Sequence, residues 1–369
     1  MAQVRRHRRA IAATFLGLVA LTFAPALAQD PGSKGATDLY DRPVLAFDPG
    51  MHTSAIQGLA IDRGGRFAVS GGDEGTIRVW SVSDGRLVRT IWAPLGPDSI
   101  GSISTVAISP DGSTIAASGE TESHSNDSPI YLFDLDSGEM LRRIVGDEPH
   151  TTGFVTFSPD GRFLAAALDN GGLRIFDRDE NWGQMFHDDQ GKDDDDSYGA
   201  SFAPDGRLAT TSFNGGGTIR LYDSKFRLIR GPIKAPSGSL PFRAEFSPDG
   251  RTLAVGYEGG VSVVDLFDGH SLALVGSTSS EMGRDYGGLS QVAWSRDGSA
   301  VFAAGSLTGD FIFSWDTNGS LRAFRNCAAN LTQDIEAAPG DRILVSTLSR
   351  RWFREIILWS VSSPGSRRP

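Results

Sequence analysis

A short turn sequence, Ser-Pro-Asp-Gly, recurs along the chain and constrains what it can fold into. Full or near-full copies stand at 109–112, 158–161, 203–206 and 247–250, with looser versions at 62–66, 295–299 and 338–342. The matching positions are 43 to 49 residues apart, which gives seven units with a period of about 46 residues. Self-similarity at such a fixed period indicates a repeat architecture.

Alternating apolar runs surround each turn. In the second unit "TVAIS" precedes the turn, "TIAAS" follows it, and "IYLFD" comes third. Period-2 alternation rich in β-branched residues is typical of strands. Asp84-Gly85 and Asp268-Gly269 follow third runs and predict tight hairpin turns before a fourth run. The sequence therefore predicts an all-β fold, a seven-bladed β-propeller of four-stranded antiparallel blades.

The two ends of the repeat region suggest how the ring closes. The last unit contains only three strand-like runs, whereas "RPVLAFDP" at 42–49 supplies a spare run before the first unit. We expect this N-terminal strand to complete the last blade, because an open edge would otherwise remain. The propeller then spans 41–362, after a flexible N-terminus at 29–40 and before a C-terminal tail at 363–369.

Residues 1–28 are typical of a secretory signal peptide. Four arginines precede the apolar run "AIAATFLGLVALTFA", and "ALA" at 26–28 provides small residues for cleavage after Ala28. The alternative is an uncleaved anchor, but the run is short for a membrane span and ends at Pro25. We expect export to the periplasm or the extracellular space, with no stable membrane insertion after cleavage. The Sec and twin-arginine routes both stay open.

Charge and cysteine content limit the classes of partner and the kinds of cross-link that the chain can have. Removing the four arginines of the leader takes the formal charge from −10 to −14, which argues against nucleic acid as a partner. Cys327 is the single cysteine, so no intrachain disulfide can form. The mature chain is expected to be a monomeric propeller that binds a protein or peptide.

The first unit carries a specific resemblance. His52, Ser70, Glu74 and Trp80 occupy the positions of the structural hydrogen-bond tetrad of the WD-repeat β-propeller family, with Glu in place of the usual Asp. The chain resembles this family over roughly 40–362. The segments "YDRPVLAFDPGMHT" and "SYGASFAPDGRLATTSF" are similar to the propeller part of bacterial caspase-associated WD-repeat proteins, a secreted bacterial type. The resemblance implies a binding role, and it implies that the tetrad is structural.

Loop lengths indicate where a binding site would lie. Connections between second and third strands, and between units, are irregular, whereas the other turns are short and uniform. Long variable loops on a rigid scaffold concentrate binding residues, so we expect the site on that face, around the central channel. The candidate binding residues are Arg350, Arg351, Trp352, Arg284, Tyr286, Tyr257 and Asn214. Arg and Trp dominate interface energetics, although Trp352 packing under its own loop is the alternative interpretation.

The acidic loop at 186–199 is the candidate metal site. Asp193, Asp194, Asp195 and Asp196 are suitable Ca²⁺ ligands, but their spacing matches no EF-hand, and an exposed acidic loop is the alternative. No other cofactor is expected. The sequence contains no HExxH, GxSxG, SxxK or P-loop motif, and we name no catalytic residue.

These observations favour a non-catalytic WD-repeat protein-interaction scaffold in the bacterial cell envelope. Two alternatives stay open. One is a metal-dependent propeller hydrolase or lactonase with its site at the central channel. The other is a regulatory partner of a peptidase system.

Overall fold

The computed structural model describes the chain from residue 51 to residue 360, apart from several short segments. Those segments are 95–100, 122–127, 146–150, 170, 189–196, 214–215, 238–239, 260–261, 280–287, 306–310, 318–320, 326–329, 340–341 and 350–355. The chain divides into two units, Met1–Thr37 and Asp38–Pro369, and every described residue belongs to the second. The predicted leader, the N-terminal strand at 42–49 and the C-terminal tail lie outside the described residues.

The second unit is built from antiparallel sheets of consecutive strands. The first three sheets contain β1 (Ile56–Ile61), β2 (Phe67–Gly72), β3 (Thr76–Ser81) and β4 (Leu87–Trp92); β5 (Thr105–Ile108), β6 (Thr114–Ser118), β7 (Ile130–Asp134) and β8 (Met140–Ile144); and β9 (Thr151–Phe157), β10 (Phe163–Asp169), β11 (Gly172–Asp177) and β12 (Gly183–Asp188). A 3₁₀ turn, η1 (Arg178–Glu180), joins β11 to β12.

The remaining strands continue the pattern. They are β13 (Ser197–Phe202), β14 (Leu208–Ser212), β15 (Thr218–Tyr222) and β16 (Leu228–Lys234); β17 (Leu240–Phe246), β18 (Thr252–Glu258), β19 (Val263–Asp268) and β20 (Leu274–Ser279); β21 (Gln291–Trp294), β22 (Ala300–Ala304), β23 (Phe311–Asp316) and β24 (Leu321–Arg325); and β25 (Asn330–Ala338), β26 (Arg342–Ser349) and β27 (Ile356–Ser360). No helix within the described residues is long and apolar enough to cross a membrane.

The number of complete blades differs from the expectation. The fold is an all-β propeller of four-stranded antiparallel blades, but the structure shows six such blades, so the predicted count of seven four-stranded blades is wrong. The last sheet, β25–β27, has three strands among the described residues.

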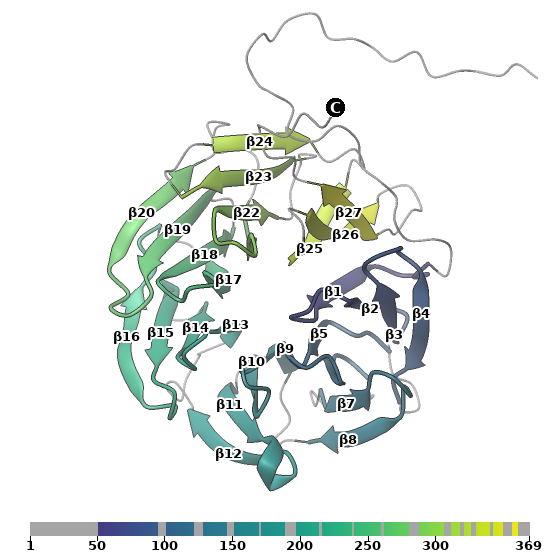
Figure 1. Ribbon diagram of the computed structural model, residues 1–369. Coiled ribbons are helices and arrows are strands. Elements are labelled where there is room, and N and C mark those ends of the chain that lie inside the picture. The colour runs from purple at the N-terminus through teal and green to yellow at the C-terminus, as the bar shows by residue number, and fades with distance from the viewer. Residues whose placement is uncertain are drawn as a thin grey trace, which may run out of the picture. The chain divides into compact units, whose positions relative to one another are not determined.

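The first strands of the sheets lie next to one another in chain order. β1 contacts β5, β5 contacts β9, and the series continues through β13, β17 and β21 to β25, which in turn contacts β1. In Figure 1 these first strands lie innermost and the fourth strands outermost. The three-stranded sheet therefore closes the circle of first strands between the β21–β24 blade and the β1–β4 blade.

Burial explains why the inner strands are nearly continuous apolar runs. Both faces of a blade are covered by neighbouring blades, so strands such as β2 bury successive side chains instead of alternating ones. Val69, Ile77, Val106 and Tyr131 share one core cluster between the first two blades. Full burial of each such side chain stabilises the fold by about 1.5–3 kcal/mol. The outer strands instead expose apolar residues, with Trp92 69% exposed.

The recurring Pro and Gly of the turn sequence have a shared packing role. A Cβ placed on Gly250 would lie 3.0 Å from Pro204 Cδ, and one on Gly65 would lie 1.9 Å from Pro339 Cγ. Each glycine also has a positive φ, +71° at Gly250 and +65° at Gly65. Glycine is therefore required twice, for its conformation and for the close approach of the preceding sheet's proline. The Gly65–Pro339 contact joins the three-stranded sheet to the first blade.

The predicted tetrad is confirmed. His52 contacts Glu74 through Nδ1 and Ser70 Oγ through Nε2 at 2.7 Å, and Trp80 Nε1 donates to Ser70 Oγ at 2.8 Å. Burial opposes ionisation of Glu74, but its hydrogen bond and charge interaction with His52 hold the pKa of Glu74 below its usual value. The chain of contacts fixes the segment before β1 against β2 and β3, which is a structural role.

Candidate functional site

Strand order defines two ends of the propeller. Connections between first and second strands and between third and fourth strands form the turn end, whereas the remaining connections form the loop end. The five irregular segments of the sequence, 93–103, 118–128, 187–198, 277–288 and 347–354, all contain connections of the loop end. The expectation that they share one end is confirmed.

Most of the predicted site residues lie outside the described residues. These are Arg350, Arg351, Trp352, Arg284, Tyr286, Asn214, Asp193, Asp194, Asp195 and Asp196. Their binding roles stay predictions.

Tyr257 is described, and its side chain is fully buried in the core. Its hydroxyl donates to Asp265, which also accepts from Ser237 Oγ at 2.9 Å and from Ser277 Oγ. Burial, together with the Asp265 contact, raises the pKa of Tyr257. In this arrangement Tyr257 satisfies a buried carboxylate between strands β18 and β19, and it does not line the channel mouth.

Three aromatic side chains gather at the loop end instead. Tyr198 near the start of β13, Phe213 directly after β14 and Phe242 near the start of β17 form what we call the aromatic cluster. The ring centroids of Tyr198 and Phe213 are 3.9 Å apart with the planes 25° from parallel, and each lies 5.8 Å from Phe242. All three residues are partly exposed. The cluster therefore presents stacked aromatic surface where two blades meet.

The backbone around the cluster explains how two blades bring these rings together. A Cβ on Gly199 would lie 2.3 Å from the carbonyl oxygen of Phe242, so only glycine permits β13 and β17 to approach this closely. Thr211 Oγ1 donates to the same carbonyl at 2.5 Å. Tyr198 Oη donates to Asp169 Oδ1 at 3.4 Å, which places a carboxylate from the neighbouring blade at the rim of the cluster.

The residue after Phe242 reaches into the interior. Arg243 is 8% exposed, and its guanidinium lies 4.4 Å from the centre of the Phe154 ring on β9. It donates to Asp334 Oδ1 at 3.3 Å and to Glu336 Oε1 at 2.6 Å, both on β25. We call Arg243, Glu245, Asp334 and Glu336 the central ionic cluster. Through this cluster, β17 of the fifth blade contacts β25 of the three-stranded sheet directly.

Asp334 extends this cluster to the first blade. Its Oδ2 accepts a hydrogen bond from the backbone N–H of Leu59 on β1 at 2.8 Å. One buried carboxylate therefore contacts Arg243 on one side and β1 on the other. The central ionic cluster links β17, β25 and β1, which are three of the first strands.

The cluster holds more carboxylates than arginines. Burial, followed by repulsion from Glu336, raises the pKa of Glu245 to about 8, and burial raises the pKa of Glu336 to about 7. Burial also raises the pKa of Asp334, while Arg243 opposes that change. Glu245 Oε2 is buried and makes no hydrogen bond to any residue that the structure describes.

The cluster does not assemble as a metal centre. Within the part of the chain that the structure describes, no group of three His, Cys, Asp or Glu side chains has an arrangement that could hold a metal ion. The carboxylates of Asp334 and Glu336 are engaged by Arg243.

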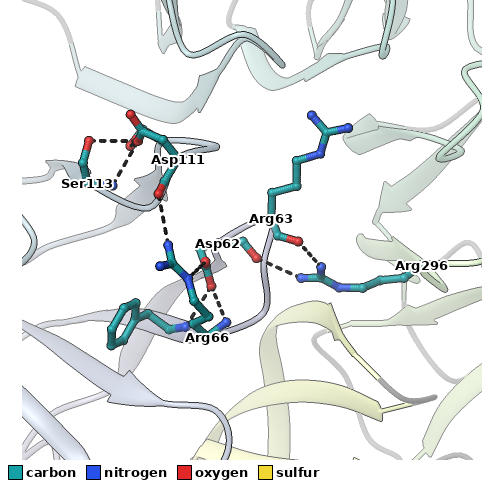
Figure 2. Close-up of polar contacts among 8 residues, drawn as sticks. Asp62, Arg63, Arg66, Asp111, Ser113 and Arg296 are labelled. Carbon is teal, nitrogen blue, oxygen red and sulfur yellow. Dashed lines mark hydrogen bonds and ion pairs between the residues drawn. The ribbon is translucent and has the colours of Figure 1, made fainter.

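At the turn end, arginines make structural contacts. Figure 2 shows Arg296, from the turn after β21, donating to the carbonyl oxygens of Asp62 and Arg63 in the first blade. Arg296 Nε also donates to the carbonyl of Ala337 on β25 at 3.2 Å. Arg66 similarly reaches the carbonyl of Asp111 in the next blade at 3.0 Å. Arg66 thus joins the first blade to the second. Arg296, in the sixth blade, contacts both the three-stranded sheet and the first blade.

Comparison with known proteins finds a family model that matches two segments of the chain. Residues 47–81 and 147–177 match the model of the family "WD domain, G-beta repeat". The chain carries WD repeats. The first match contains the confirmed tetrad, and the second contains three strands of the β9–β12 blade.

Two examples show what this propeller is similar to. A bromodomain and WD repeat-containing protein of Dictyostelium discoideum is 26% identical over 137 residues, which is 35% of this chain and 6% of that protein. The crystal structure of the Cps50 (Swd1) β-propeller domain of Myceliophteria thermophila superposes with a TM-score of 0.66 at 18% identity, covering 84% of this chain and 98% of that domain. The first likeness spans only a small part of its relative, and the second shows the fold.

Sequence reasoning missed both clusters of this WD-repeat propeller. One signal was present in the first strands, where "RAEF" at 243–246 and "QDIEAA" at 333–338 place charged residues in runs that should be buried. The segment "SYGASFAPDGRLATTSF" contains Tyr198 and Phe213, but nothing in the spacing shows that Phe242 stacks beside them.

Proposed function

We propose that this protein is an exported, non-catalytic interaction scaffold that binds a protein partner at its loop end. WD-repeat propellers generally act in this way, and both the repeat matches and the propeller fold support the assignment. The observation that carries the proposal is the aromatic cluster, because partly exposed, prepacked aromatic side chains are typical anchors of protein interfaces.

The geometry favours binding over hydrolysis. A channel hydrolase needs acidic groups that are free to hold a metal or water. Here Arg243 donates hydrogen bonds to the carboxylates of Asp334 and Glu336, and the Leu59 N–H donates to Asp334. The central ionic cluster therefore supports the scaffold, while the aromatic cluster is positioned for contact.

The binding proposal is tested by quantitative cross-linking in the producing cell. The doubly substituted Tyr198→Ala, Phe213→Ala protein is compared with the wild type, and Val275→Ala on the outer strand β20 is the matched control because Val275 is 69% exposed. We expect the double variant to lose a stoichiometric partner, with affinity reduced about thirtyfold when the pair is reconstituted. Unchanged capture by the double variant contradicts the proposal.

The export proposal has a separate test. It is supported by the arginine-rich, apolar leader at 1–28. We expect the protein recovered from the cell envelope to begin at Gln29, and a chain without residues 2–28 to stay inside the cell. Recovery of an intact N-terminus would contradict export with cleavage.

A further inference from the structure

We propose that the loop end recognises a cationic side chain, arginine or lysine, on the partner protein, and that the aromatic cluster together with Asp169 is the binding site. This inference rests on the proposed function and adds the chemistry of the partner. It joins two features of the same surface, stacked aromatic rings and a carboxylate that touches one of them.

The charge of the loop end favours a cation. Carboxyl side chains stand at the described β2–β3 and β6–β7 connections, and β10 and β18 each end on one. They are Asp73, Glu74, Glu120, Asp169 and Glu258. Among the described residues of the connections at this end, none is Lys or Arg, although β16 ends on Lys234 and β24 on Arg325. The whole chain carries a formal charge of −10. An anionic partner would be repelled by this surface, whereas a cationic segment is attracted.

The aromatic cluster supplies the second half of the site. A guanidinium or ammonium group is attracted to the face of an aromatic ring within about 6 Å of its centre. Asp169 accepts the Tyr198 hydroxyl at 3.4 Å, so a cation over this ring also lies near a carboxylate. A purely apolar partner group would gain nothing from that charge.

The protein already uses this chemistry next to the cluster. Arg243 places its guanidinium 4.4 Å from the centre of the Phe154 ring while it pairs with carboxylates of β25. A Cβ on Gly153, which adjoins Phe154, would lie 3.7 Å from the Cα of Tyr198, so the two aromatic positions belong to neighbouring strands. The interior group shows that a cation beside an aromatic ring and carboxylates fits this part of the fold.

The experiment measures binding of defined peptides to the purified full-length protein by fluorescence anisotropy. The probe is a short Gly/Ser peptide with spaced arginines, and the matched peptides carry citrulline, which is neutral and of the same shape, or glutamate. The variants are Phe213→Leu, which keeps an apolar side chain without a ring, and Asp169→Asn. The control is Asp136→Asn, which removes the same charge from the exposed β7–β8 turn at the other end.

We expect saturable binding of the arginine peptide, about three- to thirtyfold weaker for each site variant and unchanged for Asp136→Asn. Equal binding of the citrulline peptide, equal loss in the Asp136→Asn control, or no saturable binding overturns the inference. Failure can be assigned: if cellular capture depends on the aromatic cluster but the arginine peptide does not bind, the scaffold proposal survives and the cationic specificity is wrong. If neither depends on the cluster, both are wrong.

Discussion

Glu245→Gln is the substitution that tests the central ionic cluster most directly. In the folded protein burial raises the pKa of Glu245 to about 8, whereas a carboxyl in the unfolded chain titrates near 4.5. The folded state therefore keeps a proton that the unfolded state has lost. The stability contributed by this proton is fully present below pH ~4.5 and is lost as the pH rises toward ~8.

The size of the effect follows from the two pKa values. Each pH unit between them lowers the free energy of unfolding by about 1.4 kcal/mol for one proton. At pH 7, which is 2.5 units above 4.5, ionisation of Glu245 in the unfolded chain thus lowers stability by about 3 kcal/mol relative to the acidic limit. Glutamine cannot ionise, so Glu245→Gln should be more stable than the wild type at pH 7–8, with the difference shrinking toward pH 5.

Equilibrium urea unfolding at pH 5, 6, 7 and 8 measures this difference, since the midpoint and slope at each pH give the free energy of unfolding. Glu139→Gln, at an exposed position in the β7–β8 turn, removes the same charge and should leave the pH dependence unchanged. A Glu245→Gln protein whose stability follows the wild type in parallel across this range would refute the reasoning, because Glu245 would then be ionised in the folded state throughout.

Three further substitutions test the packing. Arg243→Met leaves two buried carboxylates without their cation and should lower stability by about 3–5 kcal/mol in urea unfolding, whereas Arg251→Met at an exposed position should have little effect. Gly250→Ala forces a side chain into a φ of +71° against the preceding blade's proline and should cost about 1–2 kcal/mol by the same measurement; Gly276→Ala, which meets nothing within 4 Å, should be tolerated. Tyr257→Phe removes a hydrogen-bond donor from a buried carboxylate. It should lower the free energy of unfolding by about 1.5–3 kcal/mol, which a lower melting temperature would reveal; an unchanged melting temperature would show that the hydroxyl bond adds no net stability.

Local signals predicted the elements well. The runs "TIRVWS" and "IYLFD" form β3 and β7 as expected, because alternation and turn residues act within a few residues of one another. The tetrad of His52, Ser70, Glu74 and Trp80 was also predictable, since one repeat unit contains all four residues. The number of complete blades was predicted wrongly: six sheets have four strands, and the last described sheet has three.

The sequence by itself determined the repeat, the strands, the turns and the position of the irregular connections at one end. Each depends on residues close together in the chain, where backbone sterics and alternating hydrophobicity decide the outcome. Only the tertiary structure decided that Tyr198, Phe213 and Phe242 stack together and that Arg243 crosses to Asp334 and Glu336. The two sides of that ion pair are separated by about ninety residues, and the pair forms because closing the circle of first strands brings β17 and β25 to a shared interior. A buried guanidinium there must find carboxylates, and no local pattern specifies which ones.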